Sequence, residues 1–205
     1  MKITGIIVEY NPLHLGHRHH IQEARALTKC DFLIAVMSPH FTQRGTPACV
    51  DKFERTTKAL ENGVDVVIEL PTLFATQSAA VFAKSAIRIL KQAGVDAIVF
   101  GSESNDIEKL KRQAAKSIDT NLLKAKLKQG HSYASSLGLE LAPNDILGIH
   151  YVREAQKLGI KTLTIQRTNQ YHDESLEADI LSASAIRKAH LDGIDTGQSL
   201  VNMDY

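Results

Sequence analysis

The chain has 205 residues, of which 43% are hydrophobic and 23% are charged, and its formal net charge at pH 7 is +1. This length predicts a single domain with a sizeable core, and the near-neutral charge excludes a general polyanion binder while it leaves room for a local basic patch. No apolar run approaches the ~20 residues of a membrane-spanning helix, and two cysteines without a signal peptide predict reduced thiols in a cytoplasmic protein.

Short apolar runs alternate with helical patterns along the whole chain. Each run is rich in β-branched or aromatic residues, and the runs are residues 3–8, 32–36, 64–68, 97–100 and 162–165. Helical periodicity covers residues 17–28, 51–62, 77–93, 106–129, 145–158 and 184–191. Strands that alternate with helices predict an α/β protein with a parallel sheet buried on both faces. We therefore expect a doubly wound, five-stranded, Rossmann-like sheet.

The winding of the sheet predicts where a ligand binds. If the first three strands wind one way and the last two the other, the first strand is central and the winding reverses between it and the fourth. Open α/β sheets bind ligands at the carboxyl ends of their strands, at such a switch point. Residues 10–17 follow the first strand and Gly101 ends the fourth. We expect both to lie at one site, with Gly101 facing a nucleotide.

The turn after the first strand carries the clearest chemistry in the sequence. Asn11-Pro12 ends the strand, and the next helix begins beside two imidazoles three residues apart, those of His14 and His17. Free N–H groups in the first turn of a helix form an anion site, so a phosphate is the implied ligand. Gly16 would let a flat or bulky group approach the backbone. A plain surface turn is an alternative, and no nearby cysteine or carboxylate completes a tetrahedral metal site.

Basic side chains gather in two other segments. The loop at residues 38–47 is long for a strand-to-helix connection, as lids often are. Residues 109–128 are rich in Lys and Arg with Asp119 as the single acid, which suggests contact with an RNA backbone, although a solvated helix face is the common alternative. The candidate RNA contacts are Arg44, Lys52, Arg55, Lys109, Lys111 and Arg112.

A second phosphate-type motif lies near the end of the sequence. Ser182 and Ser184 fall at the predicted start of the last helix, where hydroxyls cap the helix or donate to phosphate oxygens. Arg187, three residues later, can reach a β- or γ-phosphate from the same turn. Alone this is an N-cap with a surface arginine, but its pairing with the histidine turn favours phosphate binding. Arg167 ends the fifth strand at the same edge of the sheet.

Both motifs resemble signatures of a known superfamily. His14-Leu15-Gly16-His17 and residues 182–187 look like the two signatures of the nucleotidyltransferases related to class I aminoacyl-tRNA synthetases, with Ala183 where many members have serine. Within that superfamily the chain resembles the tRNA(Met) cytidine acetate ligases along essentially its whole length. The further matching segments are residues 8–12, 36–38, 43–45, 67–71, 100–103 and 143–148. Members of that family continue into a C-terminal helical region that is largely absent here.

The resemblance implies an ATP-dependent enzyme. It would activate acetate as acetyl-adenylate and transfer the acetyl group to the wobble cytidine of elongator tRNA(Met), with Mg²⁺ bound through the ATP phosphates. Residues 1–205 would form one nucleotidyltransferase-like ATP-binding domain, with His14 and His17 as catalytic residues. The implied ATP-binding residues are Ile7, Val8, Glu9, Tyr10, Asn11, Pro12, Leu13, His14, Leu15, Gly16, His17, Arg18, His19, His20, Gly101, Asn144, Arg167, Thr168, Ser182, Ser184 and Arg187.

Two alternatives stay open from the sequence. One is a coenzyme-type adenylyltransferase that uses ATP and a phosphorylated small acceptor, as the pantetheine-phosphate and nicotinamide-mononucleotide enzymes do. The other is a truncated ATP- or RNA-binding module without turnover. The sequence predicts neither the residue that orients acetate nor a base for the transfer step, and it predicts no oligomeric state.

Overall fold

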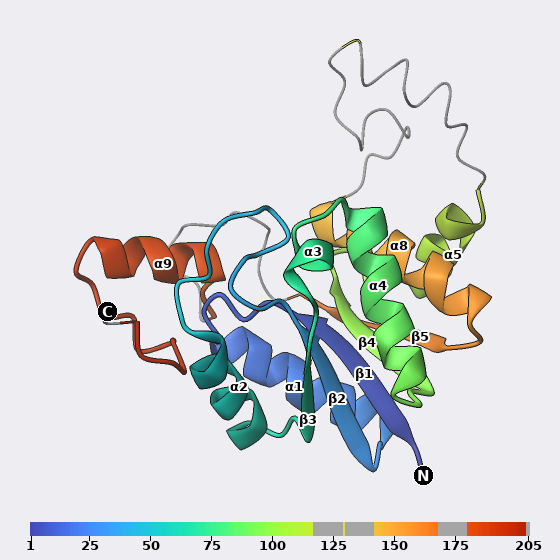
Figure 1. The fold of residues 1–205 in the computed structure, drawn as a ribbon, viewed down its shortest axis with the longest axis horizontal. Helices are drawn as coiled ribbons and strands as arrows, with labels where there is room; N and C mark the ends of the chain where they lie inside the picture. Colours follow the sequence, from blue (N-terminus) through green and yellow to red (C-terminus); the bar gives the residue numbers. More distant parts are fainter. Residues whose placement is uncertain (117–128, 130–141, 168–179, 204–205) are drawn as a thin grey trace.

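A five-stranded parallel sheet runs through the part of the protein that the computed structural model describes, which is residues 1–116, 129, 142–167 and 180–203 (Figure 1). The strands are β1 (Ile3–Val8), β2 (Phe32–Met37), β3 (Val66–Glu69), β4 (Ala97–Ser102) and β5 (Lys161–Gln166). Their order is β3-β2-β1-β4-β5, and every pairing is parallel. This order confirms the predicted doubly wound sheet, with β1 in the centre and the reversal between β1 and β4.

Helices cover both faces of this sheet. They are α1 (Leu15–Thr28), α2 (Lys52–Glu61), α3 (Thr72–Ala75), α4 (Ala79–Gln92), α5 (Ile107–Ala115), α8 (Pro143–Lys157) and α9 (Ala183–Leu191). The sequence missed α3, because a single turn is too short to show a helical period. Of the helix predicted over residues 106–129, α5 forms the first part and residues 117–128 lie outside the described chain. Within the described residues, no helix is both long and apolar enough to cross a membrane.

The strands build a separate core on each face. In β2, Leu33, Ala35 and Met37 belong to the core under α1 and α2, whereas Ile34 and Val36 belong to the core under α4 and α8. Successive side chains of a strand point to opposite faces, so one apolar run supplies both layers. Burial of each Val, Leu, Ile or Phe side chain contributes about 1.5–3 kcal/mol. The uninterrupted apolar runs of the sequence are therefore what a sheet covered on both sides requires.

Two carboxylates join the end of β4 to the start of α8. The buried Asp145 side chain accepts hydrogen bonds from the Ser102 hydroxyl and from the backbone N–H groups of Glu103, at 3.1 Å, and Ser104, at 3.2 Å. In return, the Glu103 carboxylate accepts from Asn144 Nδ2 at 2.6 Å and from the Asp145 backbone N–H at 3.1 Å. The free N–H groups at the start of α8 are thereby satisfied, and the β4 turn is fixed against that helix.

The segment that follows α9 returns to the turn before α1. Its backbone at residues 198–200 pairs with that of residues 13–15, and the Leu200 N–H donates to the Leu13 carbonyl at 2.9 Å. Antiparallel pairing satisfies backbone groups that would otherwise be left without partners beside the helix start. The start of α1 is thus fixed by β1 on one side and by this returning segment on the other.

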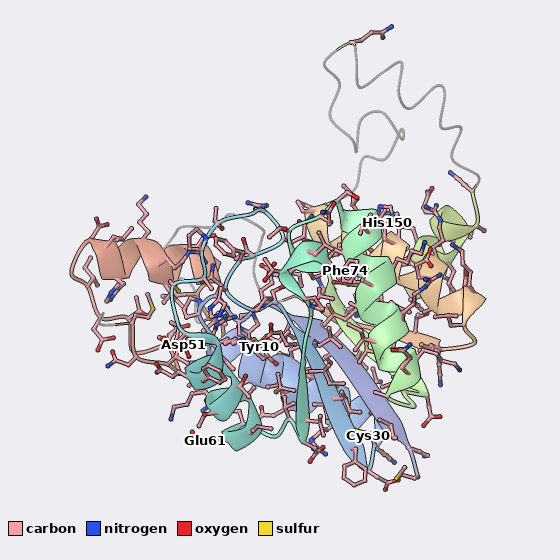
Figure 2. The ribbon with its side chains drawn as sticks, in the orientation of Figure 1. Tyr10, Cys30, Asp51, Glu61, Phe74 and His150 are labelled. Atoms are coloured by element: carbon pink, nitrogen blue, oxygen red, sulfur yellow. The ribbon has the colours of Figure 1, made fainter. Side chains whose placement is uncertain are left out.

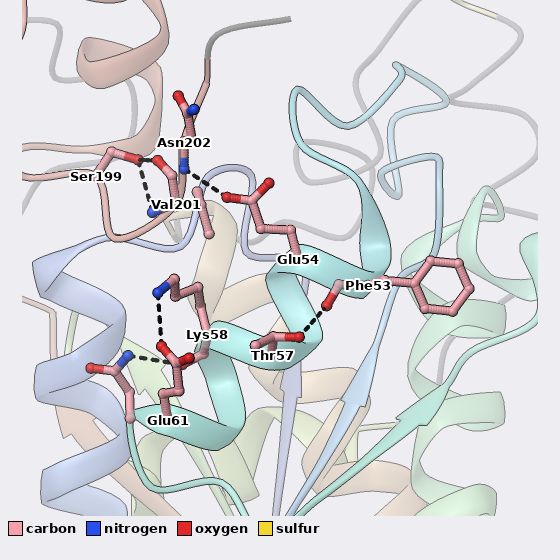
Figure 3. Close-up of polar contacts among 9 residues, drawn as sticks. Phe53, Glu54, Thr57, Lys58, Glu61, Ser199, Val201 and Asn202 are labelled. Atoms are coloured by element: carbon pink, nitrogen blue, oxygen red, sulfur yellow. Dashed lines mark hydrogen bonds and ion pairs between the residues drawn. The ribbon is translucent and has the colours of Figure 1, made fainter.

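Figure 3 shows where the returning segment reaches α2. The Asn202 backbone N–H donates to Glu54 Oε1 at 2.8 Å, and the Ser199 hydroxyl donates to the Val201 carbonyl at 2.7 Å. The Val201 side chain is buried and joins the core under α1 and α2. Residues close to the end of the described chain therefore pack into the same core as the first strand.

We expect Asp145→Ala to destabilise the fold, because it leaves the Ser102 hydroxyl and two backbone N–H groups without an acceptor. The expected loss is about 3 kcal/mol in the free energy of unfolding, measured with urea. The control is Asp106→Ala, which removes the exposed N-cap of α5 at the same edge of the sheet and should cost about 1 kcal/mol. Equal losses in the two variants would contradict the role given to Asp145.

Candidate active site

A cavity of about 300 Å³ lies at the carboxyl ends of β1, β4 and β5, where the strand order predicts a ligand site. Its volume suits a small molecule. The walls come from the ends of these strands, the starts of α1, α4, α8 and α9, and the loop after β2. The lining residues are Ile7, Val8, Glu9, His14, Gly16, His17, His19, His20, Gln43, Arg44, Phe82, Phe100, Gly101, Asn144, Leu147, Tyr151, Ile165, Gln166, Arg167 and Ser182.

The structure brings many of the predicted ATP-binding residues to this cavity. Those on its lining are Ile7, Val8, Glu9, His14, Gly16, His17, His19, His20, Gly101, Asn144, Arg167 and Ser182. Those not on its lining are Tyr10, Asn11, Pro12, Leu13, Leu15, Arg18, Ser184 and Arg187. Thr168 lies outside the described residues. Segments from the two ends of the sequence thus meet at one site.

His14 has a structural and a chemical role at the start of α1. It is the N-cap of the helix, and its Nδ1 accepts from the Gly16 backbone N–H at 3.0 Å. An accepting Nδ1 carries no proton, so the neutral ring carries its proton on Nε2. Burial, with Arg167 and Arg187 nearby, lowers the pKa of His14 to about 4. At neutral pH His14 is therefore an uncharged imidazole with an N–H donor on the side away from the helix.

His17 packs against the His14 ring. The two ring centroids are 4.0 Å apart, and His17 Nδ1 lies 3.4 Å from the His14 backbone nitrogen. Burial lowers the pKa of His17 well below its ordinary value, and neighbouring His14, His20 and Arg167 act in the same direction, while a hydrogen bond with the Pro12 backbone acts in the opposite direction. The buried ring of Tyr10, whose φ is +53°, meets His17 edge-on, with ring centroids 5.0 Å apart. Tyr10 therefore supports an imidazole instead of lining the cavity.

His20 connects α1 to the sheet. Its Nε2 lies 3.3 Å from the Val99 carbonyl of β4, and since a carbonyl only accepts, Nε2 carries the proton. Burial lowers the pKa of His20 to about 4. Its ring reaches the cavity wall, but its N–H already has a protein partner.

The two glycines predicted to admit a nucleotide have protein side chains over them. A Cβ at Gly16 would lie 2.8 Å from His14 Cε1 and 3.3 Å from Ile180 Cγ2. A Cβ at Gly101 would lie 3.1 Å from Arg167 Cγ. All three distances are shorter than ordinary packing allows, so glycine makes room here for His14 and Arg167. Gly16 and Gly101 also line the cavity, and the approach of a nucleotide to them stays a prediction.

Arg167 is the clearest sign of an anionic ligand. It lies on the cavity wall, and its Nε is buried without a hydrogen-bond partner among the described residues. Burial lowers the pKa of Arg167, while the nearby Glu103 carboxylate acts in the opposite direction. Buried polar groups in folded proteins nearly always have partners. A guanidinium on a cavity wall, with one N–H that has no partner among the described residues, suits an anionic ligand such as a phosphate.

The serine motif lies on α9, across from the histidines. Ser182 caps the helix by accepting from the Ala185 N–H at 3.0 Å. The Arg187 guanidinium donates to the Asn11 carbonyl and, at 3.3 Å, to Ser184 Oγ. Arg187 thereby joins α9 to the turn that follows β1, a link between residues 176 positions apart in the sequence. The pairing of the two motifs predicted from the sequence is present as a direct contact.

Arg55 does not contact RNA, contrary to the prediction. Its side chain is only 1% exposed and donates to four backbone carbonyls, those of Glu9, Ser38, Pro39 and Val50. A buried guanidinium with this many acceptors is a structural group that fixes a loop. The sequence could not distinguish it from a surface arginine, because the helical period of α2 does not show that the loop folds over one face.

The other candidate RNA contacts lie in different places. Lys52 forms an ion pair with Glu69 at 2.5 Å, and Lys111 forms one with Glu108 at 2.8 Å. Arg44 is exposed and belongs to the cavity lining. On α5, Lys109 is half-buried and Arg112 is exposed. The basic face that remains a candidate is therefore on α5.

The sequence analysis did not predict seven residues of the lining, most of them apolar and two of them with amide side chains. These are Gln43, Phe82, Phe100, Leu147, Tyr151, Ile165 and Gln166. Most of them lie in periodic apolar patterns, where each is indistinguishable from an ordinary core residue. The one available signal was position, because Phe100 and Ile165 lie near the carboxyl ends of β4 and β5, where α/β sheets bind ligands.

The model of the HIGH nucleotidyl transferase family matches residues 1–203. The chain belongs to this family. Among curated relatives, a tRNA(Met) cytidine acetate ligase of Caldicellulosiruptor bescii is 44% identical over an alignment of 208 residues, which covers 92% of this chain and 52% of that protein. One of Listeria monocytogenes is 45% identical over 215 residues, covering 94% of this chain and 55% of that protein. The chain thus spans about half the length of the curated relatives it matches.

Solved structures of TmcAL from Thermotoga maritima have the same fold. The apo form superposes with a TM-score of 0.87 at 40% identity, over 99% of this chain and 55% of that one. The form bound with alpha-thio ATP gives a TM-score of 0.80 at 41% identity, over 94% of this chain and 51% of that one. These likenesses confirm the family resemblance seen in the sequence.

The buried histidines should make stability depend on pH. Burial lowers the pKa of His14, His20 and His150 to about 4, whereas the ordinary value is 6.5. Between these values the unfolded chain binds protons that the folded chain does not, so the free energy of unfolding should fall as the pH drops from about 6.5 to about 4.

The test removes one buried imidazole that lies away from the cavity. His150→Gln on α8 (Figure 2) should make the decline shallower in urea unfolding at pH 7, 6 and 5. His40→Gln, at an exposed position, is the control and should leave the slope of the wild-type protein unchanged. A His150→Gln slope as steep as that of the wild type would contradict the burial argument.

Proposed function

We propose that this chain provides the ATP-dependent, adenylate-forming domain of a cytoplasmic tRNA(Met) cytidine acetate ligase. It activates acetate to acetyl-adenylate and transfers the acetyl group to the wobble cytidine of elongator tRNA(Met). The observation that supports the first step is that the neutral imidazoles of His14 and His17 and the guanidinium of Arg167 line one cavity at the switch point of the sheet. The names of the relatives and the alpha-thio ATP in the TmcAL structure support the substrates.

In the first step an acetate oxygen attacks the α-phosphorus of ATP. The new phosphorus–oxygen bond forms as the bond to the bridging oxygen breaks, and pyrophosphate leaves with that electron pair. His14 and His17 donate hydrogen bonds to the α-phosphate and bridging oxygens as negative charge grows there. Because burial keeps both rings neutral at pH 7, they act as fixed donors at the positive end of α1 and not as acids.

The leaving pyrophosphate is held on the opposite wall by the serine motif. Ser182, Ser184 and Arg187 present hydroxyls and a guanidinium at the start of α9, and Arg167 adds a guanidinium whose Nε has no hydrogen-bond partner among the described residues. Mg²⁺ would accompany ATP, held mainly through the phosphate oxygens. In the second step the exocyclic amine of cytidine attacks the acetyl carbonyl, and AMP leaves.

Replacement of one imidazole by an amide tests the assignment. His14→Asn keeps an acceptor near the Nδ1 position for the Gly16 N–H and removes the Nε2 donor, so the cap is retained. We expect acetate-dependent ATP–pyrophosphate exchange to fall by about 10²–10³-fold in His14→Asn and in His17→Asn, with unfolding midpoints near that of the wild type.

His40→Asn, exposed and not on the cavity lining, is the matched control and should exchange at the wild-type rate. Near wild-type exchange in both site variants would remove the catalytic role of the histidines. If the wild-type protein exchanged only with phosphopantetheine or nicotinamide mononucleotide, it would be a coenzyme adenylyltransferase. If it exchanged with no acceptor, it would be a binding module without turnover.

The proposed tRNA contact on α5 is tested by charge reversal. Lys109→Glu combined with Arg112→Glu should weaken tRNA binding and make its salt dependence shallower. The negative slope of log affinity against log salt should shrink in magnitude by about 1 for each tRNA phosphate that the helix no longer neutralises. The matched control is Lys84→Glu combined with Arg88→Glu, an exposed basic pair on α4. Equal affinities and slopes in the two double variants would place the tRNA elsewhere.

A further inference from the structure

One end of the cavity is lined by side chains that the ATP assignment leaves out. Phe82 of α4, Phe100 of β4, and Leu147 and Tyr151 of α8 form an apolar wall. Phe82 is 2% exposed, and the rings of Phe100 and Tyr151 meet edge-on with centroids 5.5 Å apart. Three of the four belong to the buried core under α4 and α8, and Leu147 packs against it. The wall is therefore rigid and already formed without a ligand.

The direction of the reaction places the second substrate at this end. In-line displacement at the α-phosphorus requires the entering oxygen and the leaving pyrophosphate to lie on opposite sides of that atom. The serine motif that holds pyrophosphate is on α9. Figure 1 shows α9 beside one end of the sheet's carboxyl edge, with α4 and α8 at the other. An attacking carboxylate must therefore come from the α4 and α8 side.

A cation lies beside the apolar wall. The Gln43 backbone N–H donates to Glu9 Oε1 at 2.6 Å, and Gln43 Nε2 donates to the Gln77 carbonyl, just before α4, at 2.6 Å. These two bonds hold the loop after β2 against the cavity, with the next residue, Arg44, on the lining. Glu9 also interacts electrostatically with Tyr151 of the wall and with three arginines, Arg44, Arg55 and Arg187. Arg167, in contrast, lies among the histidines at the other end.

We infer that this end of the cavity is the acyl subsite, which takes a short aliphatic carboxylate with its alkyl group against Phe82 and Tyr151 and its carboxylate beside Arg44. The inference rests on the proposed function and adds the residues that select and orient the acid. Phe82 limits the length of the alkyl chain, because a rigid wall can exclude an added methylene by about tenfold or more. Arg44 offers the carboxylate a charge-assisted hydrogen bond.

Binding of acyl-adenylate analogues tests the wall without turnover. Acetyl-, propionyl- and butyryl-sulfamoyladenosine are titrated calorimetrically into the wild-type protein, Phe82→Leu and Leu147→Ala. The wild type should bind the acetyl compound at least tenfold more tightly than the butyryl compound, and Phe82→Leu should reduce that ratio at least fivefold. Phe74→Leu, on α3 and off the lining (Figure 2), is the matched control and should keep the wild-type ratio.

Two outcomes would overturn the wall assignment. One is a wild-type protein that binds the three analogues equally or not at all. The other is a ratio of acetyl to butyryl affinity that is the same in Phe82→Leu and Leu147→Ala as in the control Phe74→Leu. If ATP–pyrophosphate exchange depends on acetate but these variants keep the wild-type binding ratios, the subsite is rejected and the proposed function stands. Chain-length selection at Phe82 without acetate-dependent exchange would keep the subsite and reject acetate as the substrate.

Arg44 is tested by separating the two substrates kinetically. In ATP–pyrophosphate exchange, Arg44→Gln should raise the KM for acetate at least tenfold and leave the KM for ATP within about twofold, and Arg44→Lys should recover part of the loss. An equal rise in both KM values, or an unchanged KM for acetate, would exclude Arg44 as the group that faces the carboxylate.

Discussion

The hydrogen bond from the Gly16 backbone N–H to His14 Nδ1 joins the fold of this protein to its chemistry. It caps α1, and by occupying Nδ1 it determines that the neutral ring carries its proton on Nε2. The lack of a Cβ at Gly16 is what lets the His14 ring come so close to the backbone. One local contact thus decides where the helix begins, which tautomer the histidine adopts and why glycine lies between the two histidines.

The rest of the molecule holds this contact in place. β1 ends in the centre of the sheet, the segment at residues 198–200 pairs with the turn before α1, and Arg187 reaches the Asn11 carbonyl from α9. On the other side of the winding reversal, Asp145 and Glu103 fix the β4 turn against α8. Positions that must not move by even an ångström during an in-line displacement are therefore held by buried hydrogen bonds from several elements.

Much of this arrangement could be predicted from the sequence. The alternation of apolar runs and helices predicts a parallel sheet, and the winding assumed for it places residues 10–17 and Gly101 at one edge, because parallel strands end on one side. The histidine and serine motifs together favour one phosphate site, and the structure joins them through Arg187 and the Asn11 carbonyl. What failed was burial: Arg55 looks like a surface cation, yet four carbonyls enclose it. The conformation of the loop after β2 decides this burial, and no periodic pattern encodes it.

The central claim is that an acetate oxygen attacks the α-phosphorus of ATP in this cavity. The most direct measurement supplies the protein with ATP, tRNA and acetate labelled with ¹⁸O in both oxygens. Mass spectrometry then follows the AMP that forms, either by transfer of the acetyl group to tRNA or by hydrolysis of acetyl-adenylate. Cleavage of acetyl-adenylate at its carbonyl carbon leaves the attacking oxygen on phosphorus, so AMP should carry one ¹⁸O atom. AMP that forms in an acetate-dependent reaction without ¹⁸O would contradict the account.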